Sequence, residues 1–321
     1  MPMSETTMPA PARAPGSTAA APRRGIRRHD SLALYLVPGA VLFAAVILVP
    51  MGMNVWYSLH QWYGVGPMTW VGLRNYTQLF HDATFWASFE HQVGLVLAMA
   101  VVPTVIGLVL AAGLFDYIGG RFGARATSIL RACIYVPQVM PLAVMGVVWG
   151  WILNPQIGVL NGLLKDVGLG SLQHDWLGDP HTALYTVMAV MVWVQIGFPL
   201  VIFMAGMQRI DPSLHEAAEV DGAGWWQRFF RITVPIMRPE TYVVLLMTTI
   251  GALKSFAAIY TLTQGGPGTS TDVPSYYSYA NFFETTKVGY GAAIATVMTV
   301  ITIVVTLVLL RLQSRRQEVQ D

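Results

Sequence analysis

Charged residues are scarce in this chain. Lys, Arg, Asp and Glu make up 11% of its 321 residues, while 54% are hydrophobic. Soluble proteins carry roughly 25% charged residues, so this balance excludes an ordinary soluble domain and indicates an integral membrane protein. The net charge of +2 is too small to indicate nucleic acid binding.

Several kinds of chemical site are missing as well. Cys133 is the single cysteine of the sequence, which excludes an internal disulfide and any cysteine-based metal cluster. No pair of histidines has the spacing of a known metal motif, so we expect neither metal nor cofactor. The phosphate-binding pattern G-x-x-x-x-G-K-[ST] does not occur either, so we expect no catalytic site and no ATPase in this chain.

The sequence does contain long apolar runs, each close to the roughly 20 residues that a helix needs to cross a bilayer. They predict an all-α integral membrane fold with six transmembrane helices, near residues 32–57, 93–115, 129–153, 183–207, 242–262 and 292–312. Residues 1–30, rich in Pro, Ala, Ser and Thr, are predicted to form a disordered cytoplasmic tail. The membrane domain then covers 31–316, and 317–321 form a short C-terminal tail.

Basic residues are distributed unequally between the two sides of such a bundle. Only three lie on the side opposite the N-terminal tail: Arg74, Lys165 and Lys287. The tail side carries Arg23, Arg24, Arg27, Arg28, Arg121, Arg125, Arg209, Arg228, Arg231, Arg238, Arg311, Arg315 and Arg316. Because short cytoplasmic loops are enriched in Lys and Arg, both termini and the loop 208–239 are predicted to be cytoplasmic.

The loop 208–239 is the longest polar stretch in the C-terminal half, and its residues predict two short helices. Asp211 is a good N-cap and Pro212 suits the first helical position, although Ser213 and Glu216 also fit a capping box. Gly222 permits the left-handed turn that ends a helix. A second helix is expected from Trp225 to Ile232, where Pro235 should stop it.

This loop resembles the EAA loop of ABC-importer permeases. The matching positions are Glu216, Ala217, Ala218, Gly222, Ile232 and Pro235, with Val234 in place of the usual leucine. With Asp221, these positions are the candidate ATPase-coupling residues. Four further stretches, on the side opposite the tail, resemble elements of carbohydrate-importer permeases: 71–76 (VGLRNY), 154–161, 176–180 and 265–268 (GGPG). The plainer alternatives are an amphipathic loop and a set of ordinary turns.

The resemblance to the maltose-type group of ABC importers implies a type I importer permease fold in a bacterial cell membrane, in contact with lipid. It also implies three protein partners, which are a second homologous permease, a cytoplasmic ABC ATPase dimer and an extracytoplasmic solute-binding protein. The implied substrate is a sugar or oligosaccharide. The implied role of the loop is to couple the ATPase to the membrane helices.

Residues that face the substrate are harder to predict. Lys254 and Gln195 lie deep in apolar runs, where polar groups usually face the bundle interior or water. With Phe256 and Tyr260 they are candidates for the sugar path, since sugars need hydrogen-bond partners and aromatic faces. Alternatively, Lys254 pairs with a carbonyl group or with a carboxylate of the partner subunit.

Other functions stay open from the sequence. The solute could be something other than a sugar, such as glycerol phosphate. An ion-coupled secondary transporter would favour Asp or Glu pairs inside the spans, and a membrane enzyme would need clustered catalytic side chains. Neither pattern is evident in the sequence.

Overall fold

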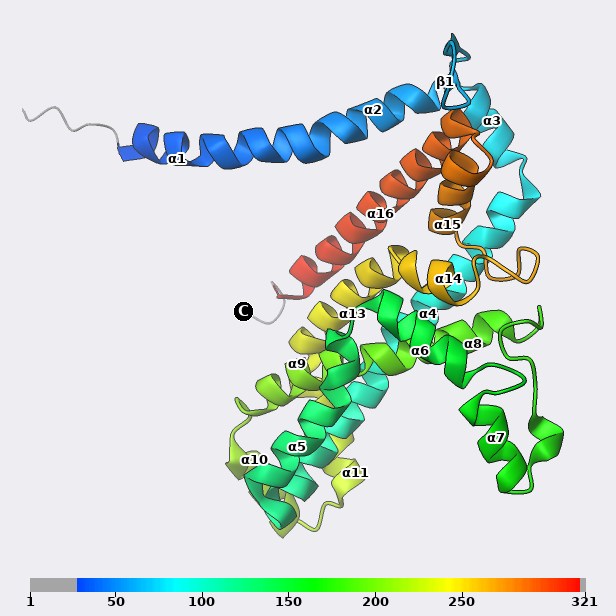
Figure 1. The fold of residues 1–321 in the computed structure, drawn as a ribbon. Coiled ribbons are helices and arrows are strands. Elements are labelled where there is room, and N and C mark those ends of the chain that lie inside the picture. The colour runs from blue at the N-terminus through cyan, green and yellow to red at the C-terminus, as the bar shows by residue number, and fades with distance from the viewer. Residues whose placement is uncertain (1–27, 318–321) are drawn as a thin grey trace, which may run out of the picture. The chain divides into compact units, whose positions relative to one another are not determined.

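The computed structural model describes residues 28–317, which are mostly helical (Figure 1). The chain divides into two compact units, Met1–Met51 and Gly52–Asp321. The predicted N-terminal tail lies outside the described residues except for its last three, which begin the first helix. Of the predicted C-terminal tail, 318–321 also lie outside them.

The first unit consists of helix α1 (Arg28–Phe43), a π-helical turn (Ala44–Leu48) and the start of α2 (Val49–Ser58). Its described side chains are almost all apolar and exposed, among them Leu36, Val41 and Val46. An apolar surface all round a helix is typical of a segment that hydrocarbon covers.

The second unit contains the other elements. A two-stranded hairpin, β1 (His60–Gln61) and β2 (Thr69–Trp70), pairs His60 with Trp70. The helices before the loop 208–239 are α3 (Arg74–Phe80), α4 (Ala83–Ala112), α5 (Gly119–Val139), α6 (Leu142–Ile152), α7 (Val159–Asp166), α8 (Ala183–Gln195) and α9 (Gly197–Met207). Those of the loop and after it are α10 (Pro212–Val220), α11 (Trp225–Arg228), α12 (Val234–Ile236), α13 (Arg238–Leu253), α14 (Ala257–Leu262), α15 (Pro274–Tyr279) and α16 (Val288–Gln317).

Helix α4 is the central element of this unit, because it packs against α8, α9 and α13. It has 30 residues, which makes it about 45 Å long at 1.5 Å per residue. On one face it buries Leu95 and Met99, while Leu97, Val101 and Val105 form an exposed apolar stripe. The buried face belongs to the protein core, and the stripe suits contact with lipid.

The start of α4 lies ten residues earlier than the sequence predicted. The side chain of Asp82 accepts hydrogen bonds from the backbone N–H groups of Thr84 (2.9 Å) and Phe85 (3.4 Å) and so forms the N-cap. The prediction followed the rise in hydropathy at Val93 and overlooked this cap, although Asp is a preferred N-cap residue.

Four helices in the described part are long and apolar enough to cross a membrane, or five if the bent pair α5 and α6 counts as one span. The sequence predicted six. The difference arises in the predicted helix 242–262, which is interrupted between α13 and α14. There the N–H groups of Lys254 and Ser255 bond to carbonyls three residues back, and that of Phe256 to the carbonyl of Lys254, so the α-helical ladder ends.

The predicted helix 129–153 is also not straight. α5 and α6 meet at an angle of 100°. Pro141 is the residue before α6 and has an extended backbone, which is the conformation of a helix boundary.

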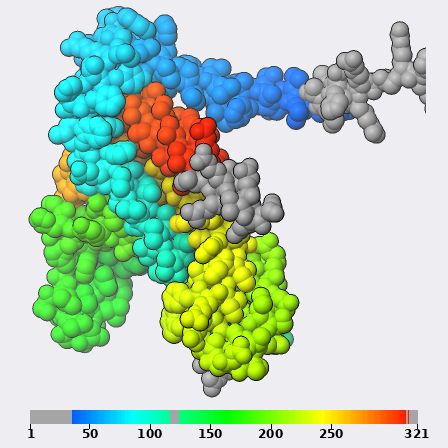
Figure 2. Space-filling model, turned by 180° about the vertical axis from the view of Figure 1, so that it is seen from behind, coloured from blue at the N-terminus to red at the C-terminus, as the bar shows by residue number. Residues whose placement is uncertain are grey.

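The second unit has two distinct ends. The hairpin and α3 lie at one end, and α10 and α11 lie at the other (Figure 1). Figure 2 shows the same arrangement from behind, with α3 among the cyan residues at the top and the loop 208–239 among the yellow-green residues at the bottom.

Candidate functional site

The loop 208–239 begins with a well-formed helix. The Asp211 carboxylate accepts a hydrogen bond from the backbone N–H of Ser213 (3.0 Å), so Asp211 rather than Ser213 is the N-cap of α10. Hydrogen bonds from Ser213 lower the pKa of Asp211. An ionised carboxylate at this position favours the helix dipole and stabilises the start of α10.

The end of α10 is a Schellman motif. The N–H of Gly222 donates to the carbonyl of Glu219 (3.0 Å), and the N–H of Ala223 donates to that of Ala218 (2.9 Å). Gly222 has φ +77°, the left-handed conformation predicted from the sequence. This closed turn directs the chain back towards the membrane helices.

The second short helix does not stop at Pro235. It runs from Trp225 through a π-helical turn (Phe229–Thr233) into α12, which contains Pro235. A proline ring normally clashes with the preceding helical turn, and the wider π turn relieves that clash. Trp225 and Phe229 share a side of this helix, with stacked rings 5.3 Å apart.

This second helix is anchored in the core of the bundle. Phe229, Met237 and Ile210 are buried in one hydrophobic cluster with the C-terminal ends of α4 and α9, represented by Ala112 and Met207. Within the loop, Arg228 forms an ion pair with Glu219 (2.8 Å), which ties α11 to α10. The two short helices are thus fixed to each other and to the bundle.

Most of the predicted loop residues lie on the outer surface of this anchored unit. Glu216, Ala217, Asp221 and Gly222 are exposed, whereas Ala218, Ile232 and Pro235 are half-buried. Exposed apolar side chains lie around them, including Leu214, Val220 (89% exposed) and Trp226 (58% exposed). An apolar surface with a charged residue at its edge, presented on a rigid support, is typical of a protein-docking surface.

The break between α13 and α14 holds the second group of predicted residues. Gln92 of α4 is buried, and its side-chain N–H donates to the carbonyl of Ala252 (2.9 Å), which also accepts from the backbone N–H of Ser255 (3.0 Å) at the break. Beyond the break, α14 packs on α6. A Cβ at Gly146 of α6 would collide with the Thr261 side chain, so these helices require glycine there. The second halves of the two interrupted segments, α6 and α14, therefore pack directly on each other.

An aromatic cluster follows the break. The ring of Phe256 lies 5.4 Å from that of Tyr260 and 5.1 Å from that of Tyr279, and Tyr276 lies 6.3 Å away. We call Phe256, Tyr260, Tyr276 and Tyr279 the aromatic cluster. The sequence predicted only its first two members, because Tyr276 and Tyr279 come from α15, beyond a long loop.

The structure does not bring the other two candidates into this cluster. Lys254 is exposed and lines a separate cavity of about 390 Å³ with Ser275, Ser278 and Thr299. Gln195 is half-buried at the end of α8. Among the described residues, neither side chain makes a hydrogen bond or ring contact with the aromatic cluster.

The other motifs of the sequence hold loops in shape. Asn75 is buried, and its side chain donates to the carbonyls of Ser58 (2.8 Å) and His60 (3.0 Å), so it ties α3 to the hairpin. Thr271 in the loop after 265–268 donates to Thr263 (2.7 Å). Asn75 thus has a structural role in the motif 71–76, and the Thr263–Thr271 contact closes the loop that contains 265–268.

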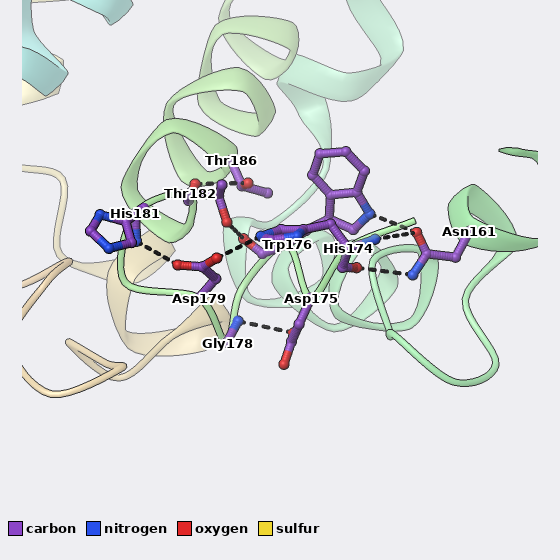
Figure 3. Close-up of polar contacts among 9 residues, drawn as sticks. All are labelled: Asn161, His174, Asp175, Trp176, Gly178, Asp179, His181, Thr182 and Thr186. Atoms are coloured by element: carbon purple, nitrogen blue, oxygen red, sulfur yellow. Dashed lines mark hydrogen bonds and ion pairs between the residues drawn. The ribbon is translucent and has the colours of Figure 1, made fainter. Parts of the chain in front are cut away.

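The segment between α6 and α8 is organised around Asn161 (Figure 3). The Asn161 amide donates to the carbonyl of His174 (2.9 Å) and accepts from the indole N–H of Trp176 (2.9 Å). The His174 ring lies 2.8 Å from the Asp179 carboxylate. The backbone N–H of His181 and the neighbouring His174 lower the pKa of Asp179. The two motifs 154–161 and 176–180 thus form one folded module.

The comparisons with known proteins agree with this architecture. Residues 104–319 match the family described as binding-protein-dependent transport system inner membrane component. The probable ABC transporter permease protein YurN of Bacillus subtilis is 37% identical, over 87% of this chain and 94% of that protein. The trehalose/maltose transport system permease protein MalF of Thermococcus litoralis is 31% identical, over 89% of this chain and 94% of that protein.

A solved structure shows the same fold. It is the crystal structure of a bacterial ABC transporter involved in the import of the acidic polysaccharide alginate, with a TM-score of 0.76 and 23% identity over 90% of this chain and 97% of that chain. Helices, loop and sequence relatives lead to one conclusion: the chain belongs to the binding-protein-dependent inner membrane components, the permease subunits of ABC importers.

Proposed function

We propose that this permease imports a sugar or oligosaccharide, powered by a separate ATPase. It crosses the membrane six times with both termini in the cytoplasm, the interrupted pair α13 and α14 forming the fifth crossing. The unequal distribution of arginines supports this orientation. Residues 31–316 form the permease domain in a bacterial cell membrane, and a second permease completes the translocation path.

The observation that carries the coupling role is the anchored loop 208–239. Glu216 and Ala217 lie on its exposed surface, while Phe229 and Met237 are buried in the bundle core. When ATP closes the partner dimer, α10 moves with it, and the buried residues transmit that movement to α4, α9 and α13. The chain contributes a mechanical coupling between two states, and hydrolysis belongs to the partner.

The aromatic cluster supports a sugar as the substrate. Interrupted helices commonly form the substrate site of a transporter, because their backbone groups are free to bind. Phe256 and Tyr260 lie directly after the break, and their rings offer the flat apolar faces on which sugar rings stack. Relatives named for trehalose/maltose and diacetylchitobiose transport agree with this class.

An anionic solute such as glycerol phosphate is the second candidate. Lys254 is a cation inside the fifth crossing, and the hydroxyl groups of Ser275, Ser278 and Thr299 line the same cavity. A phosphate would provide the partner that a cation at this depth needs.

Transport by the reconstituted complex tests the proposal. The permease, its partner permease, the ATPase and the solute-binding protein are placed in proteoliposomes, and uptake of labelled sugars and of glycerol phosphate is measured with and without ATP. ATP-dependent, vanadate-sensitive uptake of a sugar supports the proposal. Uptake driven by an ion gradient without ATP would contradict it.

Membrane orientation is tested separately. Reporter fusions after Gln320 should have cytoplasmic activity, and fusions within residues 160–175 should have periplasmic activity. The opposite result at either position would refute the orientation.

A further inference from the structure

A polar cleft lies beside α3. α3 is at the end of the bundle away from the loop 208–239 (Figure 1). Two adjoining cavities share four lining residues, Arg74, Gln78, Lys287 and Tyr290. The deeper part has a volume of about 160 Å³ and extends towards the hairpin, where Trp62 and Asn75 line it. The wider part has a volume of about 730 Å³ and is open to solvent. We call the two parts together the cationic cleft.

Two of the shared residues are cations without an anionic partner. None of the ion pairs within residues 28–317 involves Arg74 or Lys287. The carboxylate that also lines the wider part, Asp82, is already saturated with donors. The hydroxyls of Tyr277 (2.7 Å) and Tyr290 and the backbone N–H of Thr84 all donate to it.

These donors affect the ionisation of Asp82. Its partial burial would raise the pKa of Asp82, but the hydrogen bonds from Tyr290, Tyr277 and the backbone outweigh burial and lower it. Asp82 is therefore ionised at neutral pH, and its carboxylate oxygens are occupied by these hydrogen-bond donors. The positive charges of Arg74 and Lys287 stay available to a ligand.

The two cations are held on rigid backbone. Arg74 is the first residue of α3, which Asn75 fixes to the hairpin. Lys287 comes directly before α16, and its N–H donates to the carbonyl of Asn281 (2.8 Å). Behind it, Gly289 lies so close to the His60 carbonyl that no side chain fits there. Because this arrangement exists before binding, an anion would meet little ordering cost.

We propose that the cationic cleft is where the solute-binding protein docks, through one or more of its Asp or Glu side chains. The inference rests on the proposed function, which places this end of the bundle outside the cytoplasm. Charge complementarity supports it, since Arg74 and Lys287 are two of the three basic residues predicted on that face. Such pairs chiefly determine the rate and specificity of docking. The lining is too polar for a lipid chain.

Titration of the transporter with its binding protein tests the proposal. The full complex is placed in nanodiscs, and ATPase stimulation is measured against the concentration of the substrate-loaded binding protein. For Arg74→Glu/Lys287→Glu we expect the half-saturating concentration to rise tenfold or more, with an unchanged maximal rate. Raised salt should weaken docking of the natural protein and affect this variant much less.

Two further variants control for folding and for general charge. Arg74→Gln/Lys287→Gln should raise the half-saturating concentration about threefold, and it replaces the reversal variant if that complex does not assemble. Lys165→Glu changes the third basic residue of this face, which lies in α7 outside the cleft. It should change the half-saturating concentration by less than twofold. The proposal would be overturned if the half-saturating concentration changed by less than twofold in Arg74→Glu/Lys287→Glu, or in the Gln variant that replaces it.

Cross-linking separates docking from transport. In a Cys133→Ser background, a photo-reactive group at Gln78 should capture the purified binding protein, and one at Leu163 should not. Capture at Gln78 by a complex that imports no sugar would leave docking standing while the proposed function fails. If the charge reversal instead lowers only the uptake of anionic sugars at saturating binding protein, the cleft binds substrate, and the docking proposal is wrong.

Discussion

Arg209 and Glu240 form an ion pair between the end of α9 and the first turn of α13, the two helices that flank the loop 208–239. Glu240 is mostly buried there, while Arg209 is largely exposed. The pair joins both ends of the loop, so movement of the loop should displace α9 and α13 together.

Breaking this pair should therefore reduce coupling more than stability. Surface ion pairs contribute about 0.2–1 kcal/mol, too little for Glu240→Gln to unfold the bundle. We expect ATP hydrolysis to continue while sugar uptake falls several-fold. The ratio of uptake to hydrolysis in proteoliposomes measures this. The exchanged pair Arg209→Glu/Glu240→Arg should recover part of the ratio, and an unaltered ratio in Glu240→Gln would show that the pair has no such role.

Gly222 should be sensitive to any side chain. Its φ of +77° is left-handed, and a Cβ in that conformation costs roughly 1–2 kcal/mol. Open space surrounds the position, so backbone conformation rather than a clash sets this cost. We expect Gly222→Asp to stay in the membrane but to co-purify poorly with the ATPase.

Glu216→Ala should weaken co-purification more mildly. Glu216 lies past the first turn of α10, so its charge contributes less to the helix than the roughly 0.3–1 kcal/mol of a first-turn carboxylate. Membrane abundance, co-purification and uptake are measured together for both variants. If membrane abundance falls in parallel with uptake, the loop 208–239 is needed for folding and not for coupling. If Gly222→Asp has normal uptake, the loop has no coupling role.

The aromatic cluster should control apparent substrate affinity. An aromatic contact contributes about 0.5–1.5 kcal/mol, so Tyr260→Ala should raise the KM for sugar uptake about threefold to tenfold. Tyr185→Ala is the matched control, since Tyr185 is an exposed tyrosine of α8 outside the cluster. Equal KM values for the two variants would remove the cluster from the sugar path.

Asp272 should make stability depend on pH. It is buried in the loop between α14 and α15, and burial, with repulsion from Glu284, raises its pKa to about 7. The pKa of Asp272 in the folded protein lies above that of an unfolded aspartate. Its contribution to the free energy of unfolding is therefore fully present below about pH 4 and is lost as the pH rises through about 7.

We therefore expect the Tm of the purified complex to fall as the pH rises from 5 to 8, and Asp272→Asn to flatten this decrease. Thermal unfolding at a series of pH values measures it. Glu284→Gln should lower the midpoint of the decrease by removing the repulsion. A slope that is identical in the natural protein and in Asp272→Asn would contradict the assignment.

Local features of the fold were well predicted from the sequence where a single residue determines the backbone. Asp211 as N-cap and Gly222 as left-handed end of α10 are confirmed, because capping depends on residues within one helical turn. Hydropathy also located the apolar segments. Hydropathy failed at the start of α4, because the first ten residues of this helix include polar side chains and lie before the apolar run.

Features that depend on distant residues could not be predicted. The break after Leu253 contains no proline, and part of its stabilisation comes from Gln92, 160 positions earlier in the chain. Likewise, the approach of Tyr276 and Tyr279 to Phe256 and of Arg74 to Lys287 depends on tertiary packing. Composition gives no signal for such pairs.

The shared carboxylate of Asp82 has a mechanical consequence. It caps α4 and binds Tyr277 of α15 and Tyr290 of α16, so it fastens three helices together at one end. Helices fastened in this way turn as a single rigid body. Opening and closing of the transport path must then bend the chain elsewhere, and the breaks at 140–141 and 254–256 are the hinges that the fold provides.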